Sequence, residues 1–145
     1  MVQLRQEFIQ SCPMKIIDKL AWIEIKNGQI LSTRSKGRTK FYLPGGKREA
    51  VETDFEALSR EIKEELDVDL IETTVNYFGT FQAQADAHPE GVEVKMTCYT
   101  GEYKGEIQAA NEIEEVVWLT YADREKVSPV DKIIFDWLKE EHLLN

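Results

Sequence analysis

Residues 46–68 read GKREAVETDFEALSREIKEELDV, and this stretch decides the fold. It predicts a helix over 53–66. Thr53 and Glu56 form an S/T-x-x-E capping box, in which each side chain satisfies a free backbone N–H group of the first turn. The apolar residues recur at helical spacing and form one stripe for burial: Phe55, Leu58, Ile62 and Leu66.

Three glutamates lie together on another side of this helix, roughly 110° from the apolar stripe: Glu61, Glu64 and Glu65. They repel one another, because like charges at i,i+4 destabilise a helix by about 0.2–0.5 kcal/mol. A divalent cation would offset the repulsion, and Mg²⁺ prefers oxygen ligands while sharing its shell with substrate phosphates. A Glu-rich helical face alone is more often a solvated surface, so the larger pattern decides between the two interpretations.

The larger pattern resembles the Nudix box: Gly, five residues, Glu, seven residues, Arg-Glu, an aliphatic residue, any residue and Glu-Glu. Every position is in register here: Gly46, Glu52, Arg60, Glu61, Ile62, Glu64 and Glu65. With about 7% for each of six fixed residues, a chance match at one starting point has a probability of about one in ten million. The family's Gly after the Glu-Glu-x triplet is Asp67 here, which tolerates the left-handed conformation that ends a helix.

The resemblance extends on both sides of the box. Leu43-Pro44-Gly45-Gly46 is similar to the usual entry, and residues 112–118 (EIEEVVW) resemble a later Glu-containing loop and strand. It implies an α+β fold of the Nudix type, an α/β/α sandwich with a mixed central β-sheet, in a single domain over 1–145.

The residues around the box predict the remaining elements. Asn27-Gly28 separates β-forming runs at 15–26 and 29–34, which favours an N-terminal β-hairpin because both turn positions need positive φ. A short strand at 41–43 is expected to stop at Pro44-Gly45-Gly46. Longer strands, a turn and a last helix complete the prediction: strands at 73–84, 92–103 and 116–119, a turn at 89–91 and a C-terminal helix at about 130–144.

The resemblance also implies roles for the box residues. The carbonyl of Gly45 and the carboxylates of Glu64 and Glu65 would be metal ligands, with Glu61 beside them as a ligand or as the general base. Glu112, in the late loop, is the other candidate for the base and a further candidate ligand. Arg60 and Glu52 would form an ion pair that supports the catalytic turn. The expected cofactor is Mg²⁺, with Mn²⁺ as the alternative.

Substrate-binding candidates are weaker, because each has an ordinary structural interpretation. Arg34, Lys36, Arg38 and Lys40 form a basic loop that would meet phosphate, or is simply well solvated. Phe41 would stack on a base or pack in the core. Gln82 and Gln84 would form hydrogen bonds with the edge of a nucleobase, or are ordinary polar residues of an edge strand. His88 would contact the substrate or lie in an exposed loop.

Composition limits the setting and the partners. The net charge of −9 disfavours binding to nucleic-acid polymers, whose phosphates an acidic surface repels. Residues 1–11 have no apolar core of a secretory signal, and no apolar run approaches the roughly 18 residues of a membrane helix. Cys12 and Cys98 lack metal-binding spacing, which is typical of reduced thiols in a cytoplasmic protein. Three tryptophans leave room for a homodimer.

The predicted function is hydrolysis of a pyrophosphate bond in a small nucleoside diphosphate derivative. A nucleoside triphosphate, including oxidised forms such as 8-oxo-dGTP, ranks first, and a nucleotide sugar or ADP-ribose is the alternative substrate. A non-catalytic nucleotide-sensing module is the second class, although such modules usually erode the box. An isopentenyl diphosphate isomerase would need metal-binding histidines that His88 and His142 do not supply.

Overall fold

The computed structural model describes residues 14–145, so the predictions for residues 1–11 and for Cys12 fall outside it. Its centre is a mixed four-stranded sheet in the order β4 (Gly45–Lys47), β1 (Lys15–Trp22), β7 (Val92–Thr100) and β6 (Asn76–Gln84). β1 runs parallel to β7, and the other two pairings are antiparallel. No helix within 14–145 combines the length and apolarity that crossing a membrane requires.

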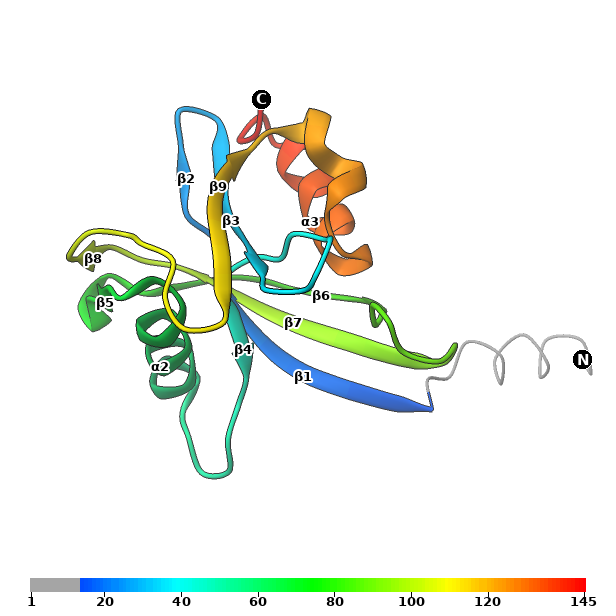
Figure 1. The fold of residues 1–145 in the computed structure, drawn as a ribbon, viewed down its shortest axis with the longest axis horizontal. Coiled ribbons are helices and arrows are strands. Elements are labelled where there is room, and N and C mark those ends of the chain that lie inside the picture. Colours follow the sequence, from blue (N-terminus) through cyan, green and yellow to red (C-terminus); the bar gives the residue numbers. More distant parts are fainter. Residues whose placement is uncertain (1–13) are drawn as a thin grey trace, which may run out of the picture.

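Two helices cover opposite faces of this sheet, α2 (Asp54–Leu66) and α3 (Pro129–Glu140) (Figure 1). The alternation of side chains along β1 explains the arrangement. Ile17 and Ala21 pack in the core that holds α3, whereas Leu20 and Trp22 pack in the core that holds α2. The predicted α/β/α sandwich with a mixed central sheet is confirmed.

The predicted hairpin is confirmed, and the β-forming run at 15–26 before it contains two strands. Asn27 and Gly28 have φ values of 53° and 74°, and they join β2 (Ile25–Lys26) to β3 (Gln29–Ser35). β1 ends at Trp22, and the next two residues carry the chain into a second sheet of order β2-β3-β9, where β9 spans Ile113–Leu119. Ile23 N–H still bonds to Tyr99 on the first sheet, whereas the Glu24 carbonyl accepts from β3.

Helix α2 begins and ends as its sequence predicts. The Thr53–Glu56 capping box is formed in both directions. At the other end Asp67 is left-handed, with φ 57° and ψ 36°, so this residue ends the helix in place of the family's Gly. Leu58, Ile62 and Leu66 are fully buried, as their spacing indicates.

Several other boundaries differ from the prediction. The 41–43 segment makes only isolated bridges, and the Pro-Gly-Gly sequence expected to stop it continues into β4. A 3₁₀ turn precedes β6, and a two-stranded sheet of β5 and β8 divides the expected 92–103 strand. β9 starts earlier than predicted, and the last helix ends earlier. The remaining bounds are η1 Glu72–Thr74, β5 Asp69–Leu70, β8 Tyr103–Lys104 and η2 Tyr121–Lys126.

Candidate active site

Arg60 organises the loop that precedes α2. Its Nε and Nη2 donate to the two carboxylate oxygens of Glu52, at 2.8 and 2.9 Å, and Nη1 donates to Glu61 at 2.8 Å. Nη2 also reaches the carbonyl of Lys47 at 3.2 Å. Donation from Arg60 and from the N–H of Glu49 lowers the pKa of Glu52 to about 2. The predicted Arg60–Glu52 pair therefore forms, and it joins the loop, the end of β4 and the helix.

Glu65 connects the same helix to the Gly-Gly segment. Its Oε1 accepts from the Gly45 N–H at 2.9 Å. Burial raises the pKa of Glu65 to about 8, and the charges of Glu61, Glu112 and Glu64 act in the same direction. Burial also raises the pKa of Glu61, against the opposing effect of Arg60. Two box carboxylates thus stand in surroundings that disfavour their charged forms.

Gly46 allows the helix to approach the sheet closely. A Cβ atom at this position would lie 2.5 Å from the carboxylate carbon of Glu61. A side chain at position 46 would displace the Glu61 carboxylate from its place. Gly is required at position 45, because its φ of 144° is in the region that other residues rarely adopt.

The late loop brings Glu112 toward the box. Its charge raises the pKa of both Glu61 and Glu65, which lie on α2, far away in sequence. Backbone bonds hold the loop there, because the Ala110 N–H donates to the Glu65 carbonyl and the Lys36 N–H donates to the Glu112 carbonyl. Glu112 itself is exposed.

These residues fit a divalent cation in their chemistry. Carboxylate and carbonyl oxygens are the ligands that Mg²⁺ prefers, and the carboxylates lie near enough to raise one another's pKa. A cation among them would reverse that effect. In the part of the chain that the structure describes, however, no three acidic, histidine or cysteine side chains already converge as a metal cage. Ligation would therefore require the glutamates to reorient toward the metal.

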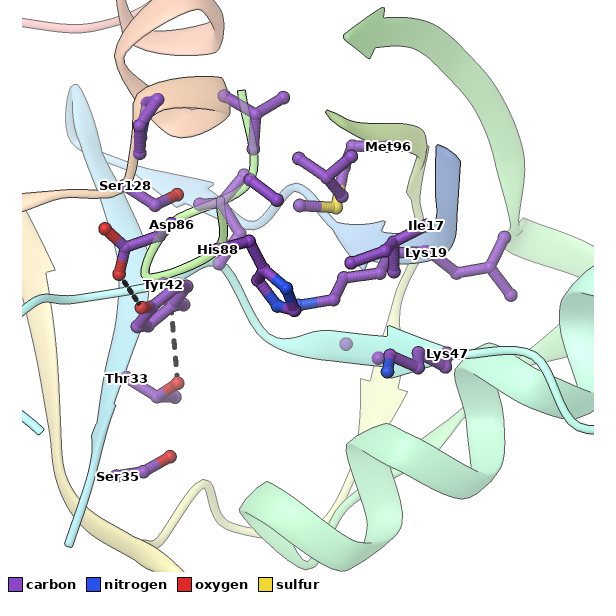
Figure 2. Close-up of a pocket in the computed structure, with 18 of the residues that line it drawn as sticks. Ile17, Lys19, Thr33, Ser35, Tyr42, Lys47, Asp86, His88, Met96 and Ser128 are labelled. Carbon is purple, nitrogen blue, oxygen red and sulfur yellow. Dashed lines mark hydrogen bonds between the residues drawn. The ribbon is translucent and has the colours of Figure 1, made fainter. Parts of the chain in front are cut away.

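A pocket of about 310 Å³ opens beside the Gly-Gly segment, on the face of the sheet that carries α3 (Figure 2). Glu65, Gly45 and Gly46 line one part of it. The rest includes an apolar portion contributed by β1, β7 and the start of α3: Ile17, Val94, Met96 and Val130. This volume is at the small end of the range for small-molecule sites.

The predicted substrate residues divide into two groups. Arg38, Gln84 and His88 line the pocket. Arg34, Phe41 and Gln82 do not line it: Arg34 pairs with Glu115 at 3.0 Å, and Gln82 is exposed and donates to Glu93. Phe41 packs against the core on the α3 side, which was the alternative interpretation of this residue. Gln84 also binds backbone atoms of the turn from Ala85 to Gly91, so its amide is partly occupied.

Sequence reasoning missed several polar groups at the pocket. Tyr42 donates to Asp86, which also pairs with Lys40 at 2.9 Å, and these contacts tie the β3–β4 connection to the β6–β7 turn (Figure 2). Asp131 is fully buried next to the pocket and accepts from the Leu43 N–H at 3.1 Å. Burial raises its pKa to about 7. Its sequence signal was available, because Asp131 falls on the apolar stripe of α3 with Ile134, Phe135 and Leu138.

Lys19 was also missed. It projects from β1 into the pocket, where burial lowers its pKa. The strand alternation that predicts Ile17 and Ala21 as buried places Lys19 on the same face.

Comparison with known proteins places this geometry in a family. The NUDIX domain model matches residues 20–138, and no curated protein matches the chain. The E. coli ORF135 protein is similar in structure with a TM-score of 0.66 and 26% identity, over 87% of this chain and 92% of that one. The MutT protein of Methanosarcina mazei Go1 shares the fold with a TM-score of 0.69 and 20% identity, over 88% and 96% of the two chains. A UDP-X diphosphatase does so with a TM-score of 0.65 and 15% identity, over 98% and 72%. With the family model covering most of its length, the chain belongs to the NUDIX domain family and is a Nudix pyrophosphohydrolase.

Proposed function

We propose that the protein hydrolyses a nucleoside triphosphate to the nucleoside monophosphate and pyrophosphate, in a reaction that depends on Mg²⁺. The observation that carries the proposal is the junction of two parts. The Glu65–Gly45 bond holds one box carboxylate in the lining of a pocket, and the Arg60 network holds Glu61 on the same helix. The same pocket has an apolar portion suited to a base. A triphosphate needs both, a place for its charge and a place for its ring.

The metal ligands in this proposal are the carbonyl of Gly45 and the carboxylates of Glu64 and Glu65, with Glu61 and Glu112 adjoining. Mn²⁺ is the alternative ion. A divalent cation supplies charge neutralisation for the phosphates and lowers the pKa of a bound water. Arg60 and Glu52 are positioning residues, since their bidentate pair fixes the loop between β4 and α2.

Glu61 and Glu112 are the two candidates for removing the proton of the attacking water. The support differs for each. Glu61 is half-buried beside the other box carboxylates, but Arg60 already occupies one of its oxygens. Glu112 is exposed and faces the box from the late loop. Each Glu→Gln variant keeps the shape and removes the base.

The substrate-binding roles of Arg38, Gln84 and His88 are supported by their place in the pocket lining. Those of Arg34, Phe41 and Gln82 have no such support, because each is committed elsewhere. Free nucleotides rather than nucleic-acid polymers suit the net charge of −9. Oxidised triphosphates such as 8-oxo-dGTP belong among the candidates. The homodimer, the cytoplasmic location and the single-domain organisation stay predictions.

The test is a panel of nucleoside triphosphates, 8-oxo-dGTP, nucleotide sugars and ADP-ribose, incubated with Mg²⁺ and assayed for release of the nucleoside monophosphate, which hydrolysis of each of them would produce. Nucleotide sugars are included because one structural neighbour is a UDP-X diphosphatase. Turnover of a triphosphate that disappears in Glu64→Gln and in Glu65→Gln supports the proposal. Turnover of nucleotide sugars or ADP-ribose alone would show that one of these, and not a triphosphate, is the substrate class. No turnover, together with nucleotide-induced thermal stabilisation, indicates a sensing module instead.

A second set of variants separates the two bases. Glu61→Gln and Glu112→Gln are compared with a control, Glu114→Gln, which removes the charge of an exposed glutamate two residues from Glu112. Loss of the base lowers kcat by about 100-fold or more. If Glu112→Gln retains the activity of Glu114→Gln, the late loop does not supply the base.

A further inference from the structure

Lys19 occupies a position that strand geometry reserves for an apolar side chain. β1 is an inner strand of the sheet, and Lys19 lies between Ile17, 7% exposed, and Ala21, 0% exposed, on the face that packs against α3. Its register partner on β7 is Met96, which is also buried. A partly buried ammonium in such surroundings is destabilising unless something compensates its charge.

A second lysine lies directly opposite the first. Lys19 pairs with Lys47 across the antiparallel β1–β4 ladder, so both side chains project from the same face of the sheet into the pocket (Figure 2). Facing like charges destabilise a strand pair. Lys47 and Arg38 accordingly add to burial in lowering the pKa of Lys19.

The protein supplies no direct counter-charge for this pair. Within residues 14–145, neither ammonium makes a hydrogen bond or an ion pair. The acidic groups that attract Lys19 are Asp131, buried in the core, and Glu65, across the Gly-Gly segment. Lys47 is exposed, whereas Lys19 is half-buried. Two cations without a protein partner on one pocket wall, one of them half-buried, indicate an anionic ligand in a chain of net charge −9.

The order of groups along the pocket suggests which anion. Ile17, with Val94 and Met96 of β7, gives the apolar portion, and Gly45 and Gly46 lie at the box end. Lys19 lies between these two parts along β1. Ile17 precedes it, and Leu20, which pairs with Gly46, follows it. A nucleotide with its base in the apolar portion and its outer phosphates at the box would bring its first phosphate to this lysine pair.

We propose that Lys19 and Lys47 together bind the phosphate that adjoins the nucleoside, and that Lys19 is a specificity residue for phosphorylated over unphosphorylated nucleosides. The inference rests on the proposed function for the identity of the substrate. It extends that function, because Lys19 lies outside the box and contributes from the opposite side of the Gly-Gly segment. The reaction product, a nucleoside monophosphate, retains this phosphate and is therefore a ligand of the same site.

The test measures binding of nucleoside monophosphates and of the matching nucleosides by calorimetry, in EDTA, so that it does not depend on turnover. Lys19→Met replaces the ammonium by a side chain that suits its apolar neighbours. We expect about tenfold or greater weakening of monophosphate binding, since charge-assisted hydrogen bonds are lost, and less than twofold change for nucleosides. Lys19→Arg should retain most of the affinity.

Lys15→Met is the matched control, because Lys15 lies on the same strand and the same face but outside the pocket lining. It should bind as the unmodified protein does. Equal weakening for nucleoside and monophosphate would overturn the inference, and so would unchanged monophosphate binding in Lys19→Met or no binding to the unmodified protein. If these affinities behave as expected while the substrate panel shows no turnover, the lysine site stands and the proposed hydrolysis fails.

Melting temperature supplies a second readout that a purely structural lysine would not satisfy. Replacement of a partly buried charge by Met among Ile17, Ala21 and Met96 should raise thermal stability while binding falls. A lysine needed for folding would give the opposite sign, with loss of stability in Lys19→Met and in Lys19→Arg.

Discussion

Replacing Asp131 by Asn should change how the stability of the protein depends on pH. The carboxylate is fully buried, its Oδ2 accepts from the Leu43 N–H, and its Oδ1 has no hydrogen-bond partner in residues 14–145. Burial raises its pKa to about 7. In the unfolded chain the same group titrates near its ordinary value of about 3.9.

The sign and size of the effect follow from these two values. Between them the folded state holds one proton more than the unfolded state, so stability is highest at acidic pH and falls as pH rises toward 7. Each pH unit corresponds to about 1.4 kcal/mol. From pH 5 to pH 8 only the first two units count, and ionisation of Asp131 should therefore lower the free energy of unfolding by about 3 kcal/mol.

Urea denaturation of the unmodified protein and of Asp131→Asn at pH 5 and pH 8 measures this. The amide cannot ionise, so the stability of the variant relative to the unmodified protein should rise by about 3 kcal/mol between the two pH values. An unpartnered amide N–H in the core costs about 1–3 kcal/mol at both pH values. This cost cancels when the relative stability at pH 5 is subtracted from that at pH 8. Titrations shared by both proteins, including that of Glu65, cancel as well. A relative stability that is the same at pH 5 and pH 8 would refute the assignment of a raised pKa to Asp131.

Three further predictions use the same structure. Thr53→Ala removes the side-chain half of the capping box and should lower the free energy of unfolding by about 1 kcal/mol, measured by urea denaturation; an unchanged midpoint would contradict it. Arg60→Lys keeps the charge but loses the bidentate bond to Glu52, and kcat should fall by about 10- to 100-fold with the circular dichroism unchanged; full activity would show that the loop needs no fork-shaped donor. In a Cys12→Ser background, the buried thiol of Cys98, whose pKa burial raises, should react with a thiol reagent only after unfolding; rapid labelling of the native protein would place Cys98 at the surface.

The elements that local chemistry determines could be predicted from the sequence. The capping box of Thr53, the positive φ values at Asn27-Gly28 and the apolar stripe of α2 each involve neighbours within a few residues. The Arg60–Glu52 pair was predicted from the resemblance, and it lies within one loop and one helix turn. In all these cases the interacting groups are close in the chain.

The errors arise where partners come from distant parts of the chain. The 15–26 run is β-forming throughout, but the bonds of Ile23 to Tyr99 and of Glu24 to Leu31 divide it between two sheets. Gly45 pairs with Ala21 in a strand, although Pro-Gly-Gly is locally a turn signal. Phe41 packs in the core on a partner from the C-terminal third, Val127.

The same reason explains the missed site residues. Lys19 and Lys47 meet only through strand register, and Asp131 bonds to Leu43, from which 88 positions separate it in the sequence. Lys19 shares its strand face with Ile17 and Ala21, and Asp131 shares its helix face with Ile134 and Leu138, so each charge interrupts an apolar stripe.

The parallel pairing of β1 with β7 has a consequence for biosynthesis. Lys19 and Met96 are register partners, so β1 cannot pair with β7 until the segment between the two strands has been translated. At about 5–20 residues per second this takes several seconds. During that time Ile17, Leu20 and Trp22 are made but have no sheet to enter, beyond the three-residue strand β4. The nascent chain is thus exposed to aggregation early in synthesis, and folding in the cell should depend on the rate of translation between β4 and β7.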